Sequence, residues 1–136
     1  MDNNALGRIY TAGEVIFRQG ELGDRMYVIQ EGKVEIVLEQ GGKEIVIAVR
    51  APGDFFGEMA LFEREVRMAT ARALGPARLL SVDQKNLLRR VHEDPSLAVR
   101  IIQAMSQRIR NLSGEVARLE NWLVELGMSQ HRESKG

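Results

Sequence analysis

Short runs of alternating apolar and polar residues fill the chain as far as Val82. From Glu14 onward these runs are rich in β-branched residues and are separated by glycines. Runs of this length, broken by glycine, are typical of many short strands. The pattern therefore predicts a mainly β domain, a sandwich or a barrel.

The most regular pair of runs, VEIVLEQ and KEIVIAV, is joined by Gly41-Gly42. Two consecutive glycines supply the positive φ angles that a tight hairpin turn requires. Because side chains alternate along a strand, each run has one apolar side. We expect both apolar sides to face the core, and they consist of Val34, Ile36, Leu38, Ile45, Ile47 and Val49.

After Val82 the apolar spacing changes from two residues to about three and a half. Asp83 is placed to cap a short helix that carries Leu87, Leu88 and Val91. Asp94-Pro95 fits the cap and first residue of a second, long helix. Its apolar residues are spaced alternately three and four apart, as in a coiled-coil seam. They are Ile102, Met105, Ile109, Leu112, Val116, Leu119, Leu123 and Leu126.

A seam of this length needs a partner, because a leucine stripe is not stable in water. The simplest alternative is that the helix folds back on its own β-domain. Its second half would extend past a small domain, so we expect a parallel homodimer through the seam. Trp122 is interpreted as packing, with capping of a ligand base as the alternative.

Composition removes several classes of function. Nineteen basic and nineteen acidic residues cancel, so the broad positive charge of a DNA-binding surface is absent. The chain has no cysteine and two histidines, His92 and His131, which are too few for a zinc cluster. No signal segment or apolar run of about 20 residues is present, so we expect a cytoplasmic protein without a membrane span.

The candidate site lies in FFGEMALFEREVRMAT, residues 55–70. Gly57 has no side chain, so its amide can approach a ligand, and Glu58 begins what looks like one helical turn with free amides. Arg67 adds a two-pronged donor, so the group favours a phosphate. Glu58 would repel phosphate unless it accepted a sugar hydroxyl, and the pair therefore indicates a phosphate and a ribose on one small molecule.

Each residue alone has a simpler interpretation. Glu58 could be an acid favourably placed at a helix start. Arg67 could be a solvated partner of Glu63 or Glu65. Their spacing after Gly57 favours ligand binding over either alternative.

FGEMAL followed by RMAT resembles the phosphate-binding cassette of cyclic-nucleotide-binding domains, such as those of the catabolite activator protein and the regulatory subunits of cyclic-AMP-dependent kinase. The resemblance runs from about Tyr10 to Trp122 and implies a jelly-roll, cupin-like barrel followed by helices. We divide the chain into a segment 1–8, a barrel 9–93 with its cassette at 55–70, a long hinge and dimerisation helix 94–127, and a tail 128–136. The tail is polar and lacks periodicity, so we expect it to be disordered.

The resemblance also implies roles for single residues. Glu58 would accept the ribose hydroxyl, Arg67 would bind the cyclic phosphate, and backbone amides of the cassette would complete the phosphate shell. Ser113 stands where the activator branch has a serine that reaches the purine. The full set of expected ligand-binding residues is Gly57, Glu58, Met59, Ala60, Arg67, Met68, Ala69, Leu112 and Ser113.

Three departures refine this expectation. Val66 replaces a proline that is common before the arginine. Met68 lacks the hydroxyl that cyclic-GMP binders often have there, which favours cyclic AMP while leaving cyclic GMP possible. Leu112 replaces an adenine-binding threonine of the activator branch. The sequence also ends where the family's transcription factors continue into a helix-turn-helix domain, so we expect no direct DNA binding.

We therefore expect a regulatory module that binds cyclic AMP and signals through its long helix and dimer interface to an unknown effector. The alternative is a structural or dimerisation module that has the same fold and no ligand. We do not expect an enzyme such as a phosphodiesterase, because no metal ligands and no positioned nucleophile are visible.

Overall fold

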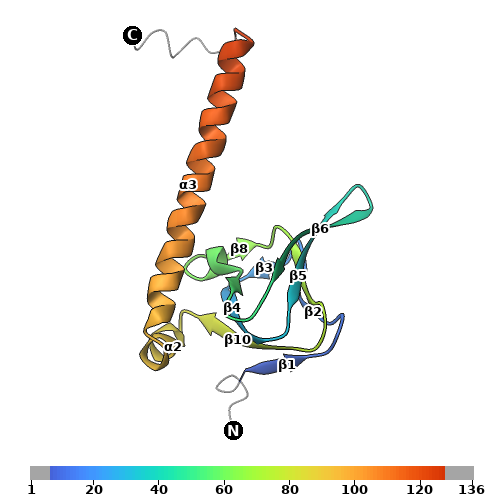
Figure 1. Cartoon of the computed structure of the whole chain (residues 1–136), viewed down its shortest axis with the longest axis vertical. Coiled ribbons are helices and arrows are strands. Elements are labelled where there is room, and N and C mark those ends of the chain that lie inside the picture. Colours follow the sequence, from blue (N-terminus) through green and yellow to red (C-terminus); the bar gives the residue numbers. More distant parts are fainter. Residues whose placement is uncertain (1–6, 128–136) are drawn as a thin grey trace. The chain divides into compact units, whose positions relative to one another are not determined.

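The computed structural model describes residues 7–127 (Figure 1). It divides into two compact units, one up to Pro95 and one from Ser96 onward, and each is described by itself. The predicted tail 128–136 lies outside the described residues, and the predicted segment 1–8 is described only from Gly7.

The first unit consists of short strands, one 3₁₀ turn and a short helix. In chain order these elements are β1 (Arg8–Tyr10), β2 (Val15–Phe17), β3 (Leu22–Gly23), β4 (Arg25–Glu31), β5 (Val34–Gln40), β6 (Lys43–Arg50), β7 (Phe55–Phe56), η1 (Glu58–Ala60), β8 (Glu65–Val66), β9 (Thr70–Ala73), β10 (Ala77–Asp83) and α2 (Leu87–Glu93).

The strands form two four-stranded sheets, with orders β1-β10-β4-β7 and β2-β9-β5-β6, and a small sheet β3-β8. All pairings described are antiparallel. Both large sheets contribute to one core, which consists of Tyr10, Ile29, Phe56, Ala77 and Leu79 from the first sheet and Val34, Ala71 and Ala73 from the second. The predicted mainly β fold with C-terminal helices is confirmed.

The β5–β6 hairpin has the predicted turn. Gly41 and Gly42 have φ angles of 60° and 77°, as a tight two-residue turn requires. The prediction that Ile45, Ile47 and Val49 face the core is wrong, because all three are exposed. β6 is an edge strand, and its register against β5 shifts at an irregularity, so its apolar side chains have no second layer within the described part of the unit.

The start of α2 also differs from the prediction. Its N-cap is Asn86, not Asp83. Asp83 instead accepts a hydrogen bond from the Asn86 amide at 2.9 Å, and the Asn86 side chain accepts one from the Asp83 amide at 2.8 Å. Asp94 ends α2, since its amide donates to the Arg90 carbonyl.

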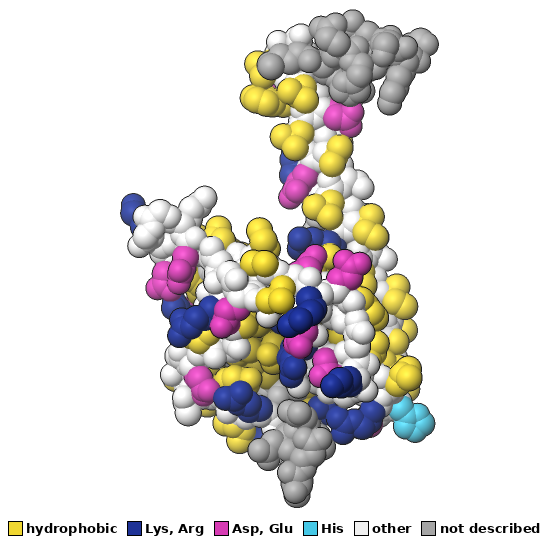
Figure 2. All heavy atoms as spheres, turned by 180° about the vertical axis from the view of Figure 1, so that it is seen from behind, with side chains coloured by type: hydrophobic (Ala, Val, Ile, Leu, Met, Phe, Trp, Pro, Cys, Tyr) yellow, Lys and Arg dark blue, Asp and Glu magenta, His cyan; other side chains and the backbone are white. Residues whose placement is uncertain are grey.

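The second unit contains α3 (Ser96–Glu125), a helix of 30 residues. At 1.5 Å per residue it is about 45 Å long. Apolar side chains are visible along this helix in Figure 2. Of the predicted seam, Ile102, Ile109, Leu112, Val116, Leu119 and Leu126 are exposed in the single chain, and Met105 and Leu123 are half-buried. The partner of this stripe stays a prediction.

Candidate functional site

The cassette begins at a backbone conformation that glycine favours. Gly57 follows β7 with φ 76° and ψ 16°, in the left-handed region, and serves as the N-cap of η1. The amides of Ala60 and Leu61 then donate to the carbonyls of Gly57 and Glu58 at 3.2 and 3.1 Å. The predicted helical turn is thus a 3₁₀ turn, and its geometry leaves the first amides without acceptors inside the turn.

Arg67 lies beside this turn, held by its backbone and by its side chain. Its amide donates to the Glu21 carbonyl at 2.7 Å, and its carbonyl accepts from the Gly20 amide at 2.8 Å. Its guanidinium donates from Nη1 to the Gly57 carbonyl at 3.2 Å and from Nη2 to the Arg25 carbonyl at 2.6 Å. The structure therefore brings Arg67 to Gly57, as the sequence predicts.

The guanidinium of Arg67 is a buried charge. The residue is only 7% exposed, and no carboxylate among residues 7–127 forms an ion pair with it. Burial lowers the pKa of Arg67, while the nearby Tyr27 and Asp24 act in the opposite direction. The alternative that Arg67 is a solvated partner of Glu63 or Glu65 is wrong, because the side chain is inside the unit.

One nitrogen of this guanidinium donates no hydrogen bond within the described part of the chain. Arg67 Nε is buried and has no hydrogen-bond partner among the described residues. A buried donor without a partner is costly, so its presence in a folded protein calls for an explanation, such as a bound water or ion. An anion that neutralised Arg67 and accepted from it would remove this cost.

Glu58 is half-buried at the start of η1. Within residues 7–127 its carboxylate makes neither an ion pair nor a side-chain hydrogen bond, although its charge acts on Arg67. A carboxylate of this kind retains its capacity to accept a hydrogen bond from a ligand hydroxyl.

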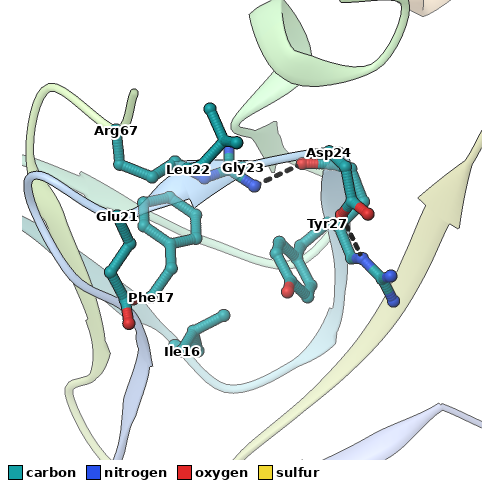
Figure 3. A pocket seen from close by; sticks show the side chains of 9 residues that line it. Ile16, Phe17, Glu21, Leu22, Gly23, Asp24, Tyr27 and Arg67 are labelled. Carbon is teal, nitrogen blue, oxygen red and sulfur yellow. Dashed lines mark hydrogen bonds and ion pairs between the residues drawn. The ribbon is translucent and has the colours of Figure 1, made fainter. Parts of the chain in front are cut away.

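A pocket of about 420 Å³ opens beside Arg67 (Figure 3). This volume lies within the range of roughly 300–1,000 Å³ found for small-molecule sites. Its lining includes Phe17, Gly23, Tyr27 and Arg67. In the close view Arg67 extends over the Phe17 ring, toward Gly23 and Asp24. The pocket therefore combines aromatic surface and a buried cation with the carboxylates of Glu21 and Asp24, and neither Gly57 nor Glu58 lines it.

The other predicted residues have different surroundings. Met59 and Ala69 are half-buried and Ala60 is buried, whereas Met68 is 77% exposed. Leu112 and Ser113 are exposed on α3, in the second unit, and their roles stay predictions.

Sequence reasoning missed Phe17, Gly23 and the Arg25 carbonyl. All three contact Arg67 from strands more than 40 positions earlier in the chain. The sequence of a short strand does not indicate which distant loop the strand will contact in the folded chain. Gly23 itself could have indicated such a contact, because an isolated glycine in a strand often marks a place where another group approaches the backbone closely.

Two negative findings apply to the described residues. No cluster of three or more metal-ligating side chains occurs between residues 7 and 127. None of the helices described is long and apolar enough to cross a bilayer.

Known proteins match the chain over most of its length. The family model for the cyclic nucleotide-binding domain matches residues 8–94. A "Putative potassium channel protein" of Rhodopseudomonas palustris is 43% identical over 111 residues, covering 79% of this chain and 26% of that protein. The chain spans between 26% and 51% of the length of the first curated relatives that it matches.

Solved structures agree with this match. The Thermus thermophilus catabolite activator protein superimposes with a TM-score of 0.70 and 32% identity, over 83% of this chain and 54% of that chain. An EAL enzyme matches in its cAMP-bound form, with a TM-score of 0.58 and 30% identity over 88% of this chain and 32% of that one. Its cGMP-bound form gives a TM-score of 0.57 and 30% identity over 88% and 33%. The chain belongs to the cyclic nucleotide-binding domain family.

Proposed function

We propose that this chain is a regulatory module whose ligand is a cyclic nucleotide, with cyclic AMP preferred and cyclic GMP as a weaker ligand. The observation that carries the proposal is Arg67, a buried cation with an unused donor, beside the left-handed Gly57 and the unpaired Glu58. The cAMP-bound and cGMP-bound forms of the similar EAL enzyme support the ligand class.

In this proposal the cyclic phosphate is bound by the Arg67 guanidinium and the first amides of the cassette, at Gly57 and Met59. The Ala60 amide already donates to the Gly57 carbonyl, so it contributes only if that bond lengthens. Glu58 accepts the ribose hydroxyl. Met68 and Ala69 line the phosphate side through their backbone.

The base is recognised mainly by apolar contacts. Met68 has no side-chain hydroxyl to bind guanine, and this favours cyclic AMP over cyclic GMP. Leu112 and Ser113 of α3 are the proposed base contacts. A ligand shifts a conformational equilibrium only through contacts that differ between the two states, so these residues would couple occupancy to the position of the helix.

The signalling unit of the proposal is a parallel homodimer. The exposed stripe on α3, with Ile109 at 63% and Leu119 at 59%, continues over more than three heptads. Leu119→Asp would place two charges in the seam, and sedimentation should then show a monomer at concentrations where the wild type is dimeric. A monomeric wild-type protein would contradict this part of the proposal and leave ligand binding intact.

A titration tests ligand binding directly. Isothermal calorimetry with cyclic AMP, cyclic GMP and linear AMP should give saturable heat for both cyclic compounds, tighter for cyclic AMP, and little for linear AMP. No heat and no rise in melting temperature at millimolar nucleotide would favour the alternative, a structural module without a ligand.

The same samples test for catalysis. We expect cyclic AMP to be recovered unchanged after incubation, because the described residues offer no metal cluster to activate water. Formation of linear AMP would show that the chain is an enzyme. The cytoplasmic location and the effector protein stay expectations from the sequence.

A further inference from the structure

Besides the carbonyls that accept its hydrogen bonds, the Arg67 guanidinium contacts an aromatic ring. The guanidinium lies over the ring of Phe17, with Cζ 4.0 Å from the ring centroid. The ring belongs to β2, and it is half-buried among Tyr27 and Phe56 at centroid distances of 6.0 and 5.8 Å. One flat face of the guanidinium is therefore covered by an aromatic surface that is itself held by two neighbours.

Gly23 meets the guanidinium at close range. A Cβ atom at this position would lie 2.2 Å from Nε and 2.4 Å from Cζ of Arg67. Unlike Gly57, Gly23 does not have a positive φ angle, so its backbone conformation is open to any residue. A side chain at this position would overlap the guanidinium, which would then have to move.

We propose that Phe17 and Gly23 are positioning residues that form a clamp, which fixes the plane of the Arg67 guanidinium in the orientation needed to bind the phosphate of the ligand. This inference rests on the proposed function and extends it to two residues outside the cassette. Both residues line the pocket beside Arg67, and in this proposal both act through Arg67.

In this proposal the clamp fixes the guanidinium without accepting hydrogen bonds from it. A guanidinium has five N–H donors in one plane. Two are directed to the carbonyls of Gly57 and Arg25, and Nε has no partner among residues 7–127. The Phe17 ring covers one face of the guanidinium, and the backbone of Gly23 lies at its edge. Neither contact accepts a hydrogen bond from the guanidinium. Two-pronged binding of phosphate depends on the direction of that plane.

Three substitutions test the clamp by calorimetry with cyclic AMP. Phe17→Leu keeps an apolar side chain but removes the ring face, and should weaken binding roughly 2- to 30-fold, which is the affinity equivalent of a cation–π contact. Phe17→Tyr keeps the face and should stay within about twofold of the wild type. Gly23→Ala should weaken binding roughly tenfold or more, because the guanidinium must move.

Tyr10→Leu is the matched control. Its ring also lies under an arginine, with Arg8 Cζ 4.7 Å from the centroid, and it is buried in the same unit, but it does not line the pocket. It should lower the melting temperature and leave the affinity for cyclic AMP within about twofold, as expected for a core ring that does not line the pocket. Equal losses of affinity in Tyr10→Leu and Phe17→Leu would reduce Phe17 to a general packing role and overturn the clamp.

The wild-type titration separates the two proposals. If the wild type binds cyclic AMP and both Phe17→Leu and Gly23→Ala bind equally well, the clamp is wrong and the proposed function stands. If the wild type binds neither cyclic AMP nor cyclic GMP, both are wrong. Melting curves of each variant without ligand show that it is folded, and Phe17→Tyr provides the conservative rescue.

Discussion

Two arginines five positions apart, Arg67 in the cassette and Arg72 on β9, have opposite surroundings. Arg72 pairs with Glu35 at 2.5 Å and Glu44 at 2.8 Å, across the sheet β9-β5-β6. The hydrogen bond that Arg72 donates to Glu35, together with the one it donates to Glu44, raises the pKa of Arg72. Burial lowers the pKa of Arg67, and only carbonyls accept its hydrogen bonds.

The chain itself neutralises the charge of Arg72 with carboxylates, whereas no described carboxylate forms an ion pair with Arg67. The sheet around Arg72 provides both carboxylates that neutralise the cation. The cassette buries a cation and supplies no ion pair from the described residues, although burying an unpaired charge is strongly unfavourable. A negatively charged ligand is the simplest way to satisfy it.

Removal of each arginine in turn should affect ligand binding very differently. Arg67→Ala should weaken cyclic AMP binding by about 2 to 5 kcal/mol, roughly thirty-fold to several thousand-fold, because a desolvated partner of the phosphate is lost. Arg72→Ala should bind within about twofold of the wild type, since its charge is already neutralised. Calorimetry on both variants measures the difference, and equal affinity in wild type and Arg67→Ala would end the phosphate assignment.

Glu58 provides the second test, because it is the acid of the cassette and yet leaves Arg67 unpaired. Glu58→Ala should cost about 1.5 to 3 kcal/mol of binding to cyclic AMP, as for one hydrogen bond to a charged group. The matched ligand is the 2′-deoxy analogue, which lacks the ribose hydroxyl. The wild type and Glu58→Ala should bind this analogue with the same affinity. If Glu58→Ala weakened binding of the analogue as much as binding of cyclic AMP, Glu58 would not act through the ribose hydroxyl.

The third test concerns stability rather than binding. Arg72→Ala should lower the free energy of unfolding by about 0.2 to 1 kcal/mol for each of its partly exposed ion pairs. Urea unfolding at low and high salt should show the difference from wild type shrinking as salt rises, because ions screen exposed pairs. A difference that grows with salt would mean that Arg72 acts through packing.

The smallest expected effect is a pH dependence at Asp24, beside the site. Its hydrogen bond from Arg25 at 2.9 Å lowers the pKa of Asp24. A carboxyl whose pKa is lowered by folding stabilises the fold above the unfolded pKa of about 3.9, and this contribution is lost as the pH falls through the lower folded value. Asp24→Asn should therefore unfold with a shallower pH dependence in acid, and an unchanged slope would show that the pair contributes nothing.

Local patterns in the sequence were sufficient for the turns and the cassette. Gly41-Gly42 and Gly57 have the positive φ angles expected of them, because a glycine's conformation depends on its nearest neighbours. The heptad spacing likewise predicted the long helix with its apolar stripe, since helical periodicity is a local property. The spacing of Gly57 and Arg67 correctly predicted that they meet.

Strand faces were harder to predict. Alternation in 45–49 indicated an apolar side, but whether that side is buried depends on what lies next to β6. The strand is at the edge of its sheet and has a register irregularity, and neither fact is encoded in the alternation itself. The same limit explains Asp83, whose side chain bonds Asn86 in a turn instead of capping α2.

Residue identities and short spacings were enough to predict the family, the position of the cassette, and an acid and an arginine nine positions apart. The burial of Arg67, its hydrogen bonds to the carbonyls of Gly57 and Arg25, and its contacts with Phe17 and Gly23 became visible only in the folded chain. The physical reason is that burial and cation–π contacts arise between residues far apart in the chain, and the folding of the two sheets around one core brings them together.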